Sequence, residues 1–128
     1  MNQPAAFQHA IASSEITRVE VLHAPDQVQT RTALSPADVA SYSTSIYDTT
    51  DTKKIATLLD AVTQTQMTPT AARPDVRWGI FFRSRTSAVT AALYLDKFGK
   101  RGVAQGKNVL LEGGAIVTLL RQQFSPKS

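Results

Sequence analysis

Apolar and polar residues alternate most clearly in the C-terminal half of the chain, between positions 75 and 124. Apolar residues recur at every second position from 76 to 82 and again from 89 to 95, the period of a strand with one buried face. Glycines at 99, 102 and 106 supply turns, and the short apolar runs at 103–104 and 109–111 indicate a further hairpin. We therefore predict an antiparallel β-meander, whose inward residues include Val76, Trp78, Ile80, Phe82, Leu93 and Leu95.

Two segments have the spacing of amphipathic helices. In residues 51–64, apolar side chains fall at i, i+3, i+4 and i+7, which forms one stripe along a helix of about three turns. The second helix is expected after Gly113 and Gly114, with Arg121 suited to its C-terminal end and Pro126 beyond it. The stripe residues of the two helices are Ile55, Leu58, Leu59 and Val62, then Ile116, Val117, Leu119, Leu120 and Phe124.

The N-terminal half gives weaker signals. Residues 15–23 alternate like a strand, with Thr17, Val19 and Val21 on one face. Residues 28–34 suggest an edge strand, and Ser35 followed by Pro36 is typical of a helix start. Residues 42–48 return to β-favouring types, while 65–74 contain two prolines and are predicted to form a loop.

These elements predict a single α+β domain over residues 15–124. An antiparallel sheet of about four to six strands would pack against two main helices. Residues 1–14 are expected to form a flexible N-terminal lead-in and 125–128 a C-terminal tail. The length of 128 residues, with 42% hydrophobic and 19% charged residues, suits one globular domain with its own core.

The composition excludes several kinds of chemistry. There is no cysteine, so disulfides, thiol catalysis and cysteine-ligated metals are excluded. Asp48 and Asp51 could hold a cation, but the calcium-loop spacing and its glycine are missing, and an Asx-turn with a helix cap explains both. Neither a nucleophile motif nor a nucleotide-binding loop is present. We predict a protein that is not an enzyme and uses no metal or cofactor.

Charge is distributed unevenly along the chain. Residues 1–64 contain four basic and seven acidic residues, whereas residues 65–128 contain ten basic and three acidic ones. Lys97, Lys100, Arg101 and Lys107 occur in two adjacent turns with Phe98 between them, which is compatible with single-stranded nucleic acid. The signatures of nucleic-acid-binding folds are missing, however. Solvated outer positions of strands explain most of this charge without an anionic partner.

Phe81 and Tyr94 lie out of phase with the inward residues of their strands. On a sheet covered from one side only, both would face outward, in the company of arginines that are enriched in protein interfaces. On a sheet covered from both sides, they would be ordinary core residues. The candidate partner-binding residues are therefore Arg77, Phe81, Arg83, Tyr94, Lys97, Lys100 and Arg101.

These observations favour a non-catalytic binding protein that acts through a protein–protein surface. An inhibitor or immunity-type partner of another bacterial protein fits best, and a homo-oligomer fits the same surface. The alternatives are a small-ligand or anion carrier with a cavity between helix and sheet, and a weak nucleic-acid binder. No apolar run reaches the ~20 residues that span a bilayer. The Thr, Ser and Gln bias favours a periplasmic or secreted location after signal removal, with the cytoplasm as the alternative.

Overall fold

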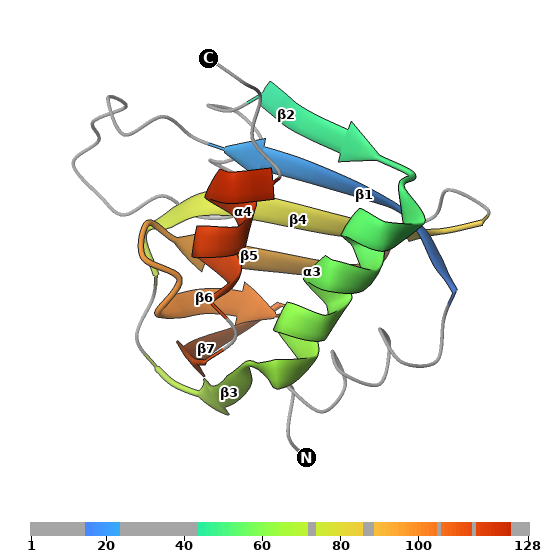
Figure 1. The fold of residues 1–128 in the computed structure, drawn as a ribbon. Helices are drawn as coiled ribbons and strands as arrows, with labels where there is room; N and C mark the ends of the chain where they lie inside the picture. The colour runs from blue at the N-terminus through green and yellow to red at the C-terminus, as the bar shows by residue number, and fades with distance from the viewer. Residues whose placement is uncertain are drawn as a thin grey trace.

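The structure, a computed structural model, describes residues 15–23, 44–71, 74–85, 89–104, 106–113 and 115–123. Seven strands form one antiparallel sheet, and two helices lie on the same face of it (Figure 1). The elements are β1 (Ile16–His23), β2 (Thr44–Thr49), α3 (Thr52–Gln64), β3 (Gln66–Pro69), β4 (Val76–Ser84), β5 (Val89–Asp96), β6 (Arg101–Ala104), β7 (Lys107–Glu112) and α4 (Ile116–Gln123). The order across the sheet is β2-β1-β4-β5-β6-β7-β3.

The predicted α+β class, the meander from β4 to β7 and both predicted helices are confirmed. The strand count is higher than the four to six expected, because β3 joins one edge of the sheet from a segment predicted to be a loop. Several predictions lie outside the described residues: the lead-in 1–14, the strand at 28–34, the helix from Ser35, Phe124 and the tail 125–128. None of the described helices is long and apolar enough to cross a membrane.

The core lies between the helices and one face of the sheet. Trp78, Ile80 and Phe82 of β4 are at most 1% exposed, and Leu93 and Leu95 of β5 are fully buried beside them. The helices contribute the predicted stripes, of which Leu58, Val62 and Leu120 are completely buried. Removing this apolar area from water is the main favourable term in folding.

Local polar contacts determine where α3 begins and how it is held. Asp51 is its N-cap: the carboxylate accepts hydrogen bonds from the amides of Lys53 (2.9 Å) and Lys54 (3.4 Å). The Lys54 ammonium contacts the Tyr47 hydroxyl on β2 and donates to the Gln123 carbonyl at the end of α4 (3.4 Å). One lysine thus connects β2, α3 and α4, and it meets the negative end of the α4 dipole.

Two predictions about single segments are wrong. The loop expected over 65–74 contains β3, which pairs with the end of β7 and buries Met67 against Leu111. This strand has one apolar anchor, and its partner lies some forty residues ahead, so local periodicity gives no signal for it. Val76 is buried, but a register shift between Val76 and Trp78 moves it into a separate cluster with Val103. A β-bulge inserts one residue and so changes the face on which a side chain lies.

Candidate functional site

The predicted partner-binding residues fall into two groups, the first of which lies on the sheet. Phe81 and Tyr94 occupy the face opposite the helices, where both are half-buried and meet edge to face with ring centroids 5.9 Å apart. The Tyr94 ring also covers Gly79, since a Cβ there would lie 3.3 Å from it. Burial raises the pKa of Tyr94. Tyr94 thus has a packing role within the sheet.

Charged residues beside these aromatics are paired with one another. Arg83 donates to Glu20 at 3.1 Å across β4 and β1, and Arg18 forms a two-point contact with Asp48 on β2. The hydrogen bonds and charge of Arg18 lower the pKa of Asp48, and Asp48 raises the pKa of Arg18. Arg77 pairs with Asp75 at 3.1 Å, and its side chain is 13% exposed. The arginines of this first group therefore already have carboxylate partners.

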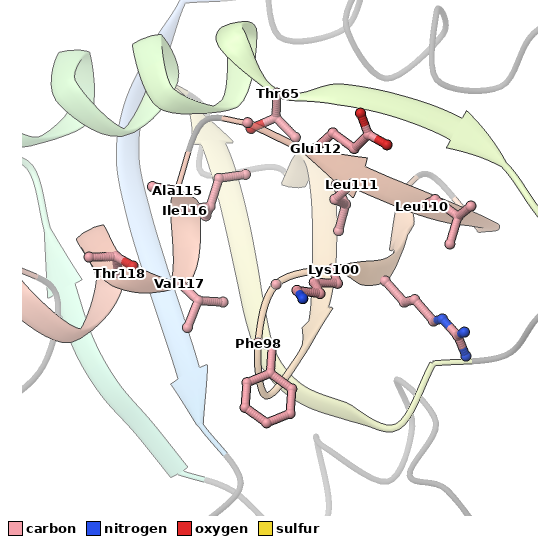
Figure 2. A pocket seen from close by; sticks show the side chains of 13 residues that line it. Thr65, Phe98, Lys100, Leu110, Leu111, Glu112, Ala115, Ile116, Val117 and Thr118 are labelled. Carbon is pink, nitrogen blue, oxygen red and sulfur yellow. The ribbon is translucent and has the colours of Figure 1, made fainter.

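The second group consists of Lys97, Lys100 and Arg101, of which Lys100 and Arg101 line a cleft of about 610 Å³ at the end of the sheet. Its walls are the 97–101 turn, the C-terminal end of β7 and the first turn of α4; we call it the turn–helix cleft. Figure 2 shows Phe98 and Thr65 at opposite ends of the cleft, with Lys100 between them. The lining residues are Thr65, Phe98, Gly99, Lys100, Arg101, Leu110, Leu111, Glu112, Gly113, Ala115, Ile116, Val117 and Thr118.

Exposed apolar surface is concentrated at this cleft. Two large apolar side chains are well exposed in the part of the chain that the structure describes: Phe98 at 71% and Leu110 at 40%. Both line the turn–helix cleft, and the buried side chains of Leu111, Ile116 and Val117 form its inner wall. Single exposed apolar residues are ordinary, but a contiguous apolar patch beside polar residues is typical of an interaction site.

The turn that presents Phe98 is held by Asp96. The Asp96 carboxylate accepts hydrogen bonds from the amides of Phe98 (3.2 Å) and Lys100 (2.9 Å), and its carbonyl accepts one from Gly99 (3.2 Å). Gly99 has φ +72°, and a Cβ there would lie 2.8 Å from Cγ2 of Val117. Only glycine satisfies both requirements without strain, and this close approach brings the turn against α4.

Positive potential predominates at the end of the cleft near Phe98. Lys100 is exposed near Phe98, and the Lys97 ammonium lies 5.7 Å from the centre of the Phe98 ring. Arg101 is exposed at the rim, and Glu112 lies near the opposite end. Helix α4 begins after Ala115, which has no side-chain oxygen to cap it, and its first internal hydrogen bond is donated by Leu119. The positive end of the helix dipole therefore faces the same cleft.

The basic residues that seemed clustered in the sequence are separated. The 97–100 turn precedes β6, whereas Lys107 follows the turn at the other end of this strand and pairs with Ala104. Lys100 and Arg101 line the cleft, whereas neither Lys97 nor Lys107 does. The two turns therefore do not form one continuous basic patch.

Sequence reasoning did not select Leu110, Val117 or Thr118, and it considered Phe98 only as a possible base-stacking residue. The signal that could have found Phe98 is its position in a turn, between Lys97 and a glycine, where an aromatic side chain has no strand or helix to pack under. Leu110 gives no such signal, because it belongs to an apolar run in β7. No three potential metal ligands come together within the described ranges.

A scan against protein-family models and searches of the curated proteins and of the solved structures found no match for this chain.

The first testable prediction concerns Gly99. We expect Gly99→Ala to lower the free energy of unfolding by about 2–3 kcal/mol, since it adds both a strained φ and a contact with Val117. Gly106→Ala is the matched control: its φ is +81°, but no atom lies within 4 Å of the added Cβ, so the cost should be about 1 kcal/mol. Urea unfolding measures both. In a Val117→Ala background, the loss of unfolding free energy caused by Gly99→Ala should approach the loss caused by Gly106→Ala. If the two substitutions cost the same in the wild-type background, the contact with Val117 does not explain the effect.

The second prediction concerns pH. Because Arg18 lowers the pKa of Asp48 below its unfolded value, the pair contributes stability above that unfolded value and loses it as the pH falls through the folded pKa. Both side chains are more than one third exposed, so a double-mutant cycle of Arg18→Gln and Asp48→Asn should give a favourable but small coupling at neutral pH. The coupling should decrease as the pH is lowered and Asp48 becomes protonated. A coupling that does not change as the pH falls would show that the contact is not ionic.

Proposed function

We propose that this chain is a non-catalytic binding protein that engages another protein through the turn–helix cleft. The observation that supports this most strongly is the position of Phe98 and Leu110, two well-exposed apolar side chains of the described residues, in one cleft beside Lys100 and Arg101. Aromatic residues and arginine are enriched in protein interfaces. A partner that covers Phe98 and Leu110 would remove this apolar surface from water.

The remaining polar groups of the cleft are also compatible with binding. The Thr65 hydroxyl donates to the Ala61 carbonyl at 2.8 Å and so belongs to the end of α3. Lys100, Arg101 and Glu112 are exposed and suit recognition of a charged surface. The role that we favour is that of an inhibitor or immunity-type partner of another bacterial protein, as the composition suggested.

A small-ligand carrier is the second candidate, because a cleft of about 610 Å³ is within the range of ligand sites. Carriers bury most of their ligand surface, however. Here the residues at the rim, including Phe98, Lys100, Glu112 and Ala115, are exposed. This openness favours a protein segment over an enclosed small molecule. Nucleic-acid binding has weaker support, because Lys107 lies at the far end of β6 from Lys100.

The third prediction tests the proposed function by quantitative affinity capture from the native host. The wild-type chain, a Phe98→Ala/Leu110→Ala variant and a Phe81→Ala variant serve as baits. The wild type and Phe81→Ala should capture at least one host protein in a constant ratio of captured protein to bait. The Phe98→Ala/Leu110→Ala variant should capture at least tenfold less of it. Thermal melting should show that the two exposed substitutions leave the fold intact. Proteins retained equally by all three baits, or lost only with Phe81→Ala, would contradict the assignment of the cleft.

A further inference from the structure

Building on the proposed function, we propose that the partner inserts an acidic segment with one large apolar side chain into the turn–helix cleft. The acidic residues of this segment would lie against Lys100 and Arg101, and its apolar side chain would lie against Phe98 and the inner wall of the cleft. The segment is identified by two properties of the cleft, the charge of its rim and the distribution of its apolar surface.

The first property is unneutralised positive charge. Arg18, Arg77, Arg83 and Arg85 each form a salt bridge with a carboxylate. Lys100 and Arg101 form none with any carboxylate of the described residues, and both are exposed at the rim. Asp96 is close in sequence, but its carboxylate accepts hydrogen bonds from the amides of its own turn. A carboxylate from a partner is therefore the natural counter-charge.

The second property is the arrangement of apolar surface around these cations. Phe98 is exposed at the rim, and the buried side chains of Leu111, Ile116 and Val117 form the inner wall. A large aliphatic or aromatic side chain fits such a hollow, because it would contact Phe98 and the inner wall together. A purely acidic ligand would leave this surface in water, so the charge and the apolar anchor are both needed.

Glu112 determines the direction of the bound segment. It lies near Thr65, toward the end of the cleft opposite Phe98 (Figure 2). Like charges repel, so the acidic residues of the partner should lie toward Lys100 and Arg101 and away from Glu112. Neutralising Glu112 should therefore strengthen the binding of an acidic segment or leave it unchanged. Neutralising Lys100 should weaken it.

A library of random eight-residue peptides displayed on phage and selected on the full chain tests this proposal. Enriched peptides should combine aspartate or glutamate with one large apolar residue. The most enriched peptide, labelled with fluorescein, is then titrated with each variant by fluorescence anisotropy. Affinity should fall about tenfold or more for Lys100→Glu/Arg101→Glu and about tenfold for Phe98→Ala, and it should fall as NaCl is raised. Replacing the apolar residue of the peptide with Ala should cost a similar factor.

Two controls separate specific recognition from overall charge. Lys53→Glu/Lys107→Glu makes the same change in net charge at exposed positions outside the cleft, and it should alter affinity less than threefold. Glu112→Gln should bind the acidic peptide as tightly as the wild type or more tightly. An equal loss with the control double variant, or a loss with Glu112→Gln, would overturn the proposed recognition.

The outcomes also distinguish this proposal from the proposed function. If the enriched peptides are neutral or basic but still require Phe98, the proposal of an acidic segment is wrong. The cleft would then remain a protein-binding site. If acidic peptides bind the Phe98→Ala variant as tightly as the wild type, the turn–helix cleft is not their binding site. Enrichment of no peptide at all would overturn recognition of a short segment, while capture of a folded host protein tests the binding function independently. A single-stranded oligonucleotide that competes for the cleft at lower concentration than the peptide would point to nucleic acid instead.

Discussion

Burial of one face of a seven-stranded sheet under two helices is the constraint on which the other features of this protein depend. The strands at the centre contribute Trp78, Ile80, Phe82, Leu93 and Leu95, all of which are almost completely inaccessible. Both helices must lie on the same face to cover them, as Figure 1 shows. Because α4 crosses the sheet, its C-terminal Arg121 lies 5.5 Å from the Trp78 ring, while its first turn reaches the ends of β6 and β7. The turn–helix cleft is therefore a direct result of how the core is covered.

The two surfaces that could bind a partner differ in what their side chains already do. On the sheet face opposite the helices, Glu20 neutralises Arg83, Asp48 neutralises Arg18, and Tyr94 packs over Gly79. Using these groups to bind a partner would require breaking contacts within the fold, which costs free energy. At the cleft, Phe98 and Leu110 are exposed and Lys100 forms no described salt bridge. Binding at the cleft would therefore cost less free energy, because fewer contacts within the fold would have to be broken.

Much of the fold could be predicted because its elements have strong local periods. The alternation through β1, β4 and β5, the stripes of α3 and α4, and the Asp51 cap all follow from neighbouring residues. β3 could not be predicted in this way, since Met67 is its one buried residue and its pairing with β7 is distant in sequence. The displacement of Val76 depends on a bulge, which alternation does not reveal.

The candidate site was predictable only in part, for a similar reason. Lys97, Lys100 and Arg101 were selected from their charge, but the cleft beside them exists because Gly99 allows the turn to approach Val117, eighteen residues later. The sequence favours Phe81 as a partner-binding residue and offers Phe98 only as a possible base-stacking residue. Their exposure differs because of tertiary packing: Phe81 meets Tyr94 edge to face, whereas Phe98 lies at the tip of a turn and is 71% exposed.

The central claim is that this protein binds its partner through the turn–helix cleft. The most direct measurement is a titration of the ¹⁵N-labelled chain with the captured partner, followed by two-dimensional amide NMR. We expect the largest shift changes or line broadening in residues 97–101, 110–113 and 115–118, with small changes at 77–83 and 92–94. Changes concentrated at 77–83 and 92–94, with the cleft amides unaffected, would contradict the account and assign binding to the opposite face of the sheet.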